Sequence, residues 1–324
     1  MTDWLKKFNL FFTKRIILLF IIFAVINILA HLPVLNLYVD IMSHFKLQYY
    51  YISFLFIAAF IYLCFFNRKF IFLFCLSVLI CLINFIEINK YYYNSDKTSS
   101  GQGIKISLFN VYTANRNFNS VLDEIKVNNP DIVILQETDK LWLENVSILK
   151  EQYPYYKEQA REDNFGIALY SKIKFIFSDT EEWTEYLLPV IRADFDYKNS
   201  TLSLYCVHTL PPANKEYINT RNKMLNQINS IIIKNKDKNI IIAGDLNTTV
   251  YSYAYKKFIA STKITDAQTK KGIKDGTWST VYIPFFRLPL EHILVTDKIK
   301  INSYKLGKNI GSDHFPVHAY IDIK

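Results

Sequence analysis

The stretch NIIIAGDLNTT, residues 239–249, begins as an apolar strand and ends in polar groups. Four apolar residues, 240–243, are followed directly by Gly244, Asp245, Leu246 and Asn247. A turn would explain the glycine, and the asparagine could cap a following element. A carboxylate and an amide delivered to the mouth of a sheet are also what an active site is built from. The rest of the chain decides between these interpretations.

Four other strand ends carry polar residues of the same few types. The five places together offer Asn110, Glu137, His208, Asp245 with Asn247, and Asp313 with His314. Each residue alone could be a turn residue, a helix cap or a histidine satisfied near the core. Capping does not account for five strand ends that offer only Asn, Glu, His and Asp.

This set of side chains restricts the chemistry. Carboxylates and amide oxygens suit a hard cation such as Mg²⁺. Imidazole and amide N–H groups can bind phosphate oxygens as their charge develops, and an aspartate can orient or deprotonate water. The strand ends lack a nucleophilic serine or cysteine, and we interpret Cys206 as a packing residue. Metal-assisted attack of water on phosphorus remains.

Short β-rich runs alternate with longer mixed segments beyond Gly103. Strands are predicted at 104–111, 131–136, 167–170, 174–177, 191–195, 201–208, 292–296, 301–306 and 317–323. Helices are predicted at 118–127, 211–236 and 253–260. Many short strands and few helices indicate a layered α/β sandwich with mixed sheets. No glycine-rich phosphate loop or G-x-G-x-x-G occurs, so no nucleotide cofactor is expected.

Residues 104–324 resemble the endonuclease/exonuclease/phosphatase superfamily, whose motifs occur here in order. The resemblance lies in LQE at 135–137, GDLN at 244–247 and SDH at 312–314, together with Asn110 and His208. It implies a four-layered α/β sandwich, with two mixed sheets flanked by helices. It also implies a metal-dependent phosphoric ester hydrolase that uses Mg²⁺, with Mn²⁺ as the alternative. NRNFNSVLDEI, GTW and an N-terminal hydrophobic region are most similar to the membrane-anchored bacterial branch.

The resemblance implies metal and water roles for four residues. Glu137 and Asn110 would hold the metal ion. Asp313 would lie near the metal or support the terminal histidine. Asp245 would position the attacking water.

The resemblance also implies a phosphate site, in which His208, Asn247 and His314 surround the scissile group. One position departs from the family pattern. PLEHILV, residues 289–295, has Glu291 where the family usually has an aspartate that orients the terminal histidine. The longer glutamate is expected to take over that catalytic role.

Two further residues are candidates for substrate binding. Arg221, on the helix after HTLPP, could reach a phosphate, or it could be a solvated or surface-paired arginine. Trp278 in GTWST could wall the site or simply pack. The run VYIPFFRLPL, residues 281–290, would suit a lipid if it is exposed and would otherwise be core.

The first hundred residues have a different composition. All eight glycines lie beyond residue 100, and the polar stretch 94–103 is predicted to be a linker. Upstream, in residues 1–93, uncharged runs at 47–66 and 70–86 are about long enough to cross a bilayer, and 16–37 is a third candidate. The alternatives are a signal peptide for the first run and a buried helical domain for all three.

The distribution of basic residues predicts the orientation of this membrane region. Six basic residues flank the spans on the N-terminal side of the membrane and four on the other, which favours a cytoplasmic N-terminus and an extracytoplasmic catalytic domain. Of the net charge of +9, residues 101–324 hold 29 basic and 25 acidic side chains. Such a mildly basic domain does not by itself require nucleic acid as a partner.

The sequence therefore predicts a multi-pass membrane protein with a Mg²⁺-dependent phosphodiesterase domain. The expected partners are the bilayer and a phosphate ester, which could be a phospholipid or another phosphodiester at the membrane surface. A nuclease acting on DNA or RNA is the first alternative and is not favoured. A catalytically inactive binding module that keeps the fold is the second.

Overall fold

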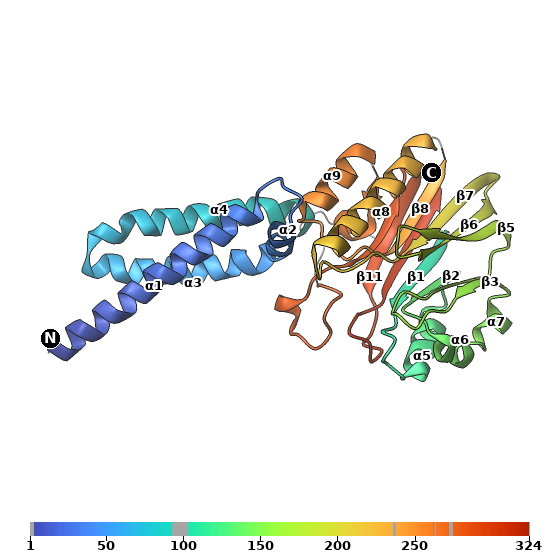
Figure 1. Cartoon of the computed structure of the whole chain (residues 1–324), viewed down its shortest axis with the longest axis horizontal. Helices are drawn as coiled ribbons and strands as arrows, with labels where there is room; N and C mark the ends of the chain where they lie inside the picture. Colours follow the sequence, from blue (N-terminus) through green and yellow to red (C-terminus); the bar gives the residue numbers. More distant parts are fainter. Residues whose placement is uncertain (1–2, 93–102, 236–237, 263, 272–274, 324) are drawn as a thin grey trace. The chain divides into compact units, whose positions relative to one another are not determined.

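The computed structural model of the chain describes residues 3–92, 103–235, 238–262, 264–271 and 275–323 (Figure 1). Its contacts divide it into two compact units, Met1–Lys90 with Tyr251–Tyr253, and Tyr91–Val250 with Ala254–Lys324. The predicted linker, 94–103, lies outside the described residues except for Gly103. Each unit is described by itself.

The N-terminal unit consists mainly of long apolar helices. Its elements are α1 (Asp3–Ala30), α2 (Leu37–Ser43), α3 (Lys46–Phe66), η1 (Arg68–Phe70) and α4 (Ile71–Tyr92). Three segments are long and apolar enough to cross a membrane, namely Phe11–Ala30, Lys46–Phe66 and Arg68–Tyr91. The boundary predicted for the first one, 16–37, is wrong, because α1 ends at Ala30, three residues before Pro33.

A buried polar pair lies inside this unit. Asn84 Nδ2 donates a hydrogen bond to Asn27 Oδ1 at 2.8 Å, and both side chains are buried. Hydrogen bonds between side chains of neighbouring helices stabilise apolar bundles. Asn27 is therefore accommodated within an apolar span by a partner on α4.

The second unit contains two six-stranded sheets. The first has the order β11-β12-β1-β2-β4-β3. These strands are β11 (Ile299–Leu306), β12 (Val317–Ile323), β1 (Ile104–Asn110), β2 (Ile132–Gln136), β4 (Ile167–Ser171) and β3 (Tyr155–Gln159). The second has the order β5-β6-β7-β8-β10-β9. These strands are β5 (Phe175–Trp183), β6 (Leu188–Tyr197), β7 (Ser200–Val207), β8 (Asn239–Asp245), β10 (Glu291–Val295) and β9 (Thr265–Asp266).

Each sheet has one parallel pair joined through a helix, β1 with β2 and β7 with β8, and its other pairs are antiparallel. A helix crossover is the usual way to connect parallel neighbours. The helices of this unit are α5 (Phe118–Asn128), α6 (Lys140–Asn145), α7 (Leu149–Gln152), α8 (Lys215–Lys234), α9 (Tyr253–Thr262), α10 (Ala267–Lys271) and η2 (Pro284–Phe286).

The helices and sheets form the layers that the sequence predicts. In Figure 1, α5, α6 and α7 cover the first sheet, and α8 and α9 cover the second from the opposite side. The inner faces of the sheets share one buried cluster that includes Ile106, Leu108, Ile191, Leu204 and Ile293. Two mixed sheets flanked by helices confirm the predicted α/β sandwich.

The predicted strand lengths are less accurate than the architecture. Runs predicted at 174–177 and 191–195 are the longer strands β5 and β6, and β3 and β9 were not predicted. Much of β5 is half-buried or exposed, so its polar residues hide the strand pattern. The helix predicted at 211–236 begins at Lys215, where the Asn214 side chain accepts a bond from Tyr217 N at 2.8 Å.

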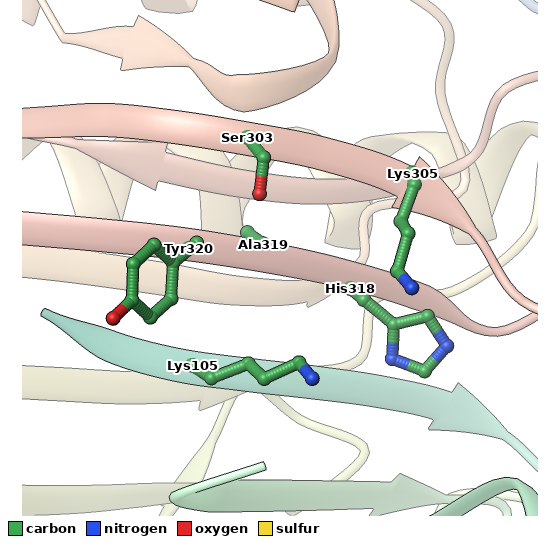
Figure 2. Close-up of a pocket in the computed structure, with 6 residues that line it drawn as sticks. All are labelled: Lys105, Ser303, Lys305, His318, Ala319 and Tyr320. Carbon is green, nitrogen blue, oxygen red and sulfur yellow. The ribbon is translucent and has the colours of Figure 1, made fainter. Parts of the chain in front are cut away.

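A cavity of about 360 Å³ lies on the outer face of the first sheet. Figure 2 shows its lining residues, Lys105, Ser303, Lys305, His318, Ala319 and Tyr320. Burial and the neighbouring Lys305 charge lower the pKa of Lys105. None of the polar strand-end residues lines this cavity.

Candidate active site

The two sheets deliver their polar residues to one place. Asn110 and Asp245 are the last residues of β1 and β8, and Glu137 directly follows β2. Since β7 runs parallel to β8, His208 leaves the second sheet beside Asp245. Glu291 is the first residue of the antiparallel β10 and pairs directly with Asp245. Strand direction and register therefore bring five of the predicted residues to the same end of the sandwich.

Asp245 is the centre of this group. Its Oδ2 atom lies 3.5 Å from Asn110 Nδ2, 3.8 Å from His208 Nε2 and 3.9 Å from His314 Nε2. All four side chains are buried. A carboxylate surrounded by two imidazoles and an amide can orient a polar molecule bound between them.

Gly244 allows the second sheet to be approached closely from the first. It lies inside β8 and not in a turn. A Cβ atom at this position would stand 1.7 Å from the Val207 carbonyl oxygen and 3.0 Å from Gln136 Nε2. The turn interpretation of this glycine is therefore wrong, and its role is to leave space beside the site.

Glu137 has an uncommon backbone conformation. Its φ is +64°, in the left-handed region that a glutamate rarely adopts. Thr113 Oγ1 donates to its carbonyl oxygen at 2.9 Å, and Asn110 Nδ2 donates to its Oε1 at 2.8 Å. These bonds hold a half-buried carboxylate at the end of β2.

Asn247 is also fixed from several sides. Its backbone φ is +46°, its N–H donates to Asp245 Oδ1 at 2.7 Å, and its Nδ2 donates to the Thr209 carbonyl at 2.7 Å. Arg221 donates from Nη1 to the Asn247 carbonyl at 3.2 Å. These bonds therefore fix the conformation of the GDLN loop, residues 244–247, next to the Asp245 carboxylate.

The prediction for Arg221 needs correction. The side chain is 0% exposed, so it is neither solvated nor paired at the surface. Its hydrogen bond to the Asn247 carbonyl places its guanidinium against the backbone of the GDLN loop. Its contact with this loop indicates a positioning role, and its contact with a phosphate stays a prediction.

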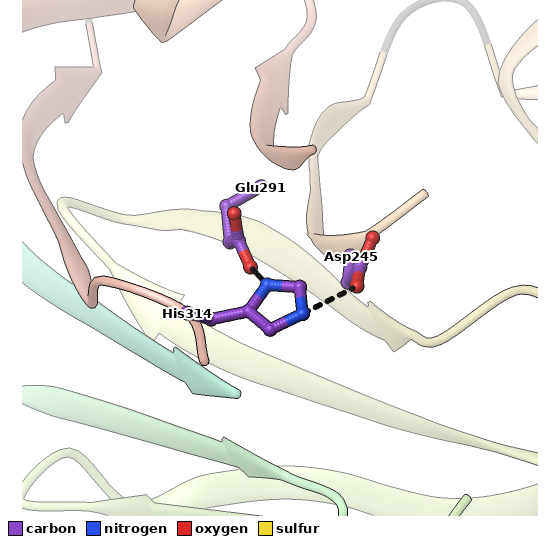
Figure 3. A group of neighbouring side chains, drawn as sticks. All are labelled: Asp245, Glu291 and His314. Atoms are coloured by element: carbon purple, nitrogen blue, oxygen red, sulfur yellow. Dashed lines mark hydrogen bonds and ion pairs between the residues drawn. The ribbon is translucent and has the colours of Figure 1, made fainter. Parts of the chain in front are cut away.

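Glu291 and His314 form a buried pair. His314 Nδ1 lies 2.5 Å from Glu291 Oε1, and Glu291 is 0% exposed. Figure 3 shows the imidazole between Glu291 and Asp245, with one ring nitrogen directed at each. The glutamate that departs from the family pattern thus lies within hydrogen-bonding distance of the histidine it was predicted to orient.

The environment separates the protonation states of the two histidines. Burial, together with the nearby His314 charge, lowers the pKa of His208 to about 3. Burial also disfavours charge on His314, but the carboxylates of Glu291 and Asp245 outweigh it and raise the pKa of His314 to about 10. Burial and the Glu291 charge raise the pKa of Asp245 to about 7. Near neutral pH, His314 is an imidazolium and His208 is neutral.

Trp278 contacts Asp313. Trp278 Nε1 donates to Asp313 Oδ2 at 3.1 Å, and the ring centres of Trp278 and His314 are 6.4 Å apart. Asp313 Oδ1 has no hydrogen-bond partner among the described residues. The tryptophan therefore orients a carboxylate whose other oxygen, Oδ1, lies 3.9 Å from His314 Nε2.

Two polar residues around the site were not predicted. Gln136 connects the sheets, since its Oε1 accepts from Asp245 N at 2.9 Å and its Nε2 donates to the Val207 carbonyl at 2.9 Å. His292 lies 2.6 Å from Asp266 Oδ2 through Nδ1 and 2.9 Å from the Thr248 carbonyl through Nε2. A polar residue inside an apolar strand was the available signal for Gln136 and His292.

Two groups of side chains could hold a divalent cation. The ligand atoms of Asp245, Glu291 and His314 lie within 4.8 Å of one another, but His314 Nδ1 is already engaged by Glu291. Burial and the Asp313 charge raise the pKa of Glu137, so a cation beside these two carboxylates would stabilise them. With Asn110 they are the predicted metal-ligand set, whose carboxylate and amide oxygens would suit Mg²⁺. In the structure, Asn110 Oδ1 accepts a hydrogen bond from Tyr112 N at 3.1 Å.

The fold and these residues define the class of a metal-dependent phosphoric ester hydrolase. Residues 108–314 match the model of the Endonuclease/Exonuclease/phosphatase family. The chain belongs to this family. No curated protein sequence matches the chain significantly.

Solved structures of similar fold include enzymes and uncharacterised bacterial proteins. D. rerio TDP2 complexed with a single-strand DNA product is 18% identical, with a TM-score of 0.56, covering 68% of this chain and 100% of that one. The human nocturnin catalytic domain with bound sulfate is 18% identical, with a TM-score of 0.54, covering 68% and 95%. A Bacteroides vulgatus endonuclease/exonuclease/phosphatase is 18% identical, with a TM-score of 0.56, covering 69% and 100%. At these identities the likeness concerns the fold.

Proposed function

We propose that this protein is a membrane-anchored, Mg²⁺-dependent phosphodiesterase that cleaves a phosphodiester at the bilayer surface. Residues 1–93 would be the membrane anchor, 94–103 the linker and 104–324 the catalytic domain. The observation that carries the catalytic part is the position of Asp245, with its Oδ2 3.5–3.9 Å from Asn110, His208 and His314. The six-to-four distribution of basic residues supports an extracytoplasmic catalytic domain.

Glu137, Asn110 and Asp313 are the residues proposed to hold Mg²⁺. A bound Mg²⁺ would polarise a phosphoryl oxygen and neutralise its developing charge. The Asn110 bond to Glu137 Oε1 at 2.8 Å supports the placement of this carboxylate. The Trp278 bond to Asp313 Oδ2 supports the other.

Asp245 is proposed to orient the attacking water and accept its proton. A base whose pKa lies near the working pH is suited to this task, and burial places that of Asp245 at about 7. His314, an imidazolium beside Glu291, would bind the phosphate oxygens as negative charge develops on them. Neutral His208 and the Asn247 amide would add N–H donors without a second positive charge.

The proposal that the substrate is a lipid rests on the apolar N-terminal unit. Three helices long enough to cross a bilayer would keep the domain close to membrane phosphodiesters. Nucleic acid is the competing substrate, because a TDP2 of similar fold is bound to single-strand DNA. The mildly basic balance of residues 101–324, with 29 basic and 25 acidic side chains, favours lipid over nucleic acid.

The test is a substrate comparison with the full chain in detergent micelles. We expect Mg²⁺-dependent cleavage of a phospholipid among sphingomyelin, glycerophospholipids, phosphoinositides, DNA and RNA. Glu137→Gln should lower kcat by at least about 100-fold, because it removes a metal ligand and not only a group that supports one. Full activity in EDTA, or in this variant, would exclude the metal mechanism. Activity on nucleic acid alone would exclude the lipid proposal, and inactivity on every substrate would favour a binding module.

A further inference from the structure

The segment 277–287, here called the rim loop, exposes large apolar side chains. Val281 is 79% exposed, Ile283 64% and Phe286 50%. The stretch 276–286 contains no charged residue, and Arg287 follows it. Contiguous exposed apolar side chains of this kind commonly mark an interaction surface.

The rim loop has internal structure that displays these side chains. Tyr282 N donates to the Ser279 carbonyl at 3.1 Å, and Phe286 N donates to the Ile283 carbonyl at 2.9 Å. The Phe285 and Phe286 rings pack edge to face, with their centres 4.6 Å apart. The apolar tip is therefore a folded turn whose side chains point away from the core.

A cationic residue lies at the base of the loop. Arg287 Nε donates to the Tyr282 carbonyl at 2.9 Å, and its guanidinium lies 4.5 Å from the centre of the Phe315 ring. This gives the loop an apolar tip above a positively charged base. Segments that enter the boundary between lipid headgroups and acyl chains combine the same two features.

The rim loop is attached to the residues of the site. Thr280 N donates to the Asp313 carbonyl at 2.8 Å, and Thr280 Oγ1 donates to the Ser312 carbonyl at 2.7 Å. Trp278 Nε1 bonds the Asp313 carboxylate, and Leu288 N bonds the Trp278 carbonyl. Whatever the tip binds is therefore held beside Asp313 and His314.

We propose that the rim loop inserts its tip, Val281, Ile283 and Phe286, into the surface of a lipid bilayer. This inference rests on the proposed membrane anchoring, since the chain's own apolar helices would supply a bilayer at short range. The base of the loop would then lie at headgroup level, where Arg287 meets lipid phosphates. The substrate would be a phosphodiester within that bilayer and not a soluble one.

Lipid contact can be measured directly with the full chain in phosphatidylcholine–phosphatidylglycerol nanodiscs. Ile283→Cys would carry an environment-sensitive fluorophore, in a background whose four native cysteines are replaced by alanine. Val127→Cys is the matched control, because Val127 is 70% exposed on α5 and is not part of the rim loop. We expect quenching by spin-labelled lipid at position 283 and little at position 127. Equal quenching at the two positions, or quenching at 283 that depends on protein concentration and not on lipid, would overturn the proposal.

Activity gives a second, independent readout. The double variant Ile283→Asp with Phe286→Asp should lower cleavage of a vesicle phospholipid by at least about tenfold, because it places two charges where apolar side chains would be buried. Its cleavage of soluble bis(p-nitrophenyl) phosphate should be unchanged. An equal loss on both substrates would count against docking. Failure of the wild type to cleave either one would count against the proposed function, while the quenching result would still test the loop.

Discussion

At the scale of single residues, Glu291 is the clearest departure from the family pattern. Its side chain has one methylene more than aspartate, and its Oε1 still lies 2.5 Å from His314 Nδ1. Glu291 is the first residue of β10 and pairs with Asp245 across the sheet, which fixes its backbone. Its second oxygen, Oε2, has no partner among the described residues. The contact with His314 is therefore the one that holds the Glu291 carboxylate in place.

Glu291→Gln should lower kcat by about 100-fold or more, because misorientation of a catalytic group is costly. The variant removes the negative charge that helps to keep His314 an imidazolium. Mg²⁺ affinity should change little, since Glu291 is not among the proposed ligands. Glu291→Asp should be milder because the charge remains even if its reach is shorter. The measurement is kcat for both variants, with Mg²⁺ titrated in each.

His314→Ala is the reference for this comparison. If Glu291→Gln keeps the kcat of the wild type while His314→Ala is inactive, Glu291 does not orient that histidine. If both Glu291 variants lose Mg²⁺ affinity in parallel with kcat, the buried group of Asp245, Glu291 and His314 holds metal instead.

At the scale of elements, Gln136 connects the two sheets next to the site through two hydrogen bonds of its side chain. It occupies both the Asp245 N–H and the Val207 carbonyl, and Gly244 leaves the space for it. Gln136→Leu should destabilise the fold by ~1–3 kcal/mol, because it leaves both backbone groups buried and unpaired. It should also lower kcat with little change in Mg²⁺ affinity, since Asp245 and not Glu137 loses a bond.

Thermal unfolding and kcat of Gln136→Leu would be read beside those of Gln136→Glu, which keeps an acceptor for Asp245 N. Wild-type stability and kcat in Gln136→Leu would show that the bond between the sheets contributes nothing.

Strand β12 contributes a pH-sensitive contact with α5. His318 Nε2 lies 3.1 Å from Glu124 Oε1, and His318 Nδ1 lies 2.7 Å from Ser107 Oγ. Burial, reinforced by the charges of Lys305 and Lys105, lowers the pKa of His318 to about 4 in spite of Glu124. A histidine whose pKa is lowered by folding costs stability in the pH range where the unfolded state binds the proton and the folded state does not. Stability should therefore fall as the pH drops below about 6.5, and this loss is complete near pH 4.

The measurement is the thermal midpoint in detergent at pH 7, 6 and 5 for the wild type and His318→Gln. The variant should lose less stability between pH 7 and pH 5, because the substituted side chain does not titrate. Identical pH slopes would assign the acid sensitivity to other groups.

The same scale shows what could be predicted from the sequence. Strand ends such as those after residues 109, 136 and 244 were predictable, because a short apolar run that stops at a polar residue is typical of a buried strand reaching the edge of its sheet. Strand β10 was predicted one residue late, which missed that Glu291 is itself in register with Asp245. Gln136 and His292 could not be assigned, since their partners come from other strands and loops distant in sequence. The exposure of the rim loop could not be predicted either, because the same apolar run is equally compatible with a buried core.

At the scale of the whole molecule, the charge distribution predicts orientation. Alkaline phosphatase fused after Lys324 should be active, and a fluorescent protein that matures only in the cytoplasm should be dark at the same position. The reason is the excess of basic residues on the N-terminal side of the spans, six against four. An inactive phosphatase with a bright fluorescent protein would place the catalytic domain in the cytoplasm.

The pairing of β1 with β12 has a consequence for synthesis. Leu108 pairs with Val317, so the first strand of the domain, which can pair with β2 early, waits for its antiparallel partner until about 200 residues later, and such distant pairing is slow. A ribosome adds ~5–20 residues per second, so this wait lasts roughly 10–40 s. His314 is synthesised only just before β12. A nascent chain therefore holds Asn110 and Glu137 early but lacks the terminal histidine of the site until its sheet can close, so the complete site should form only at the end of synthesis.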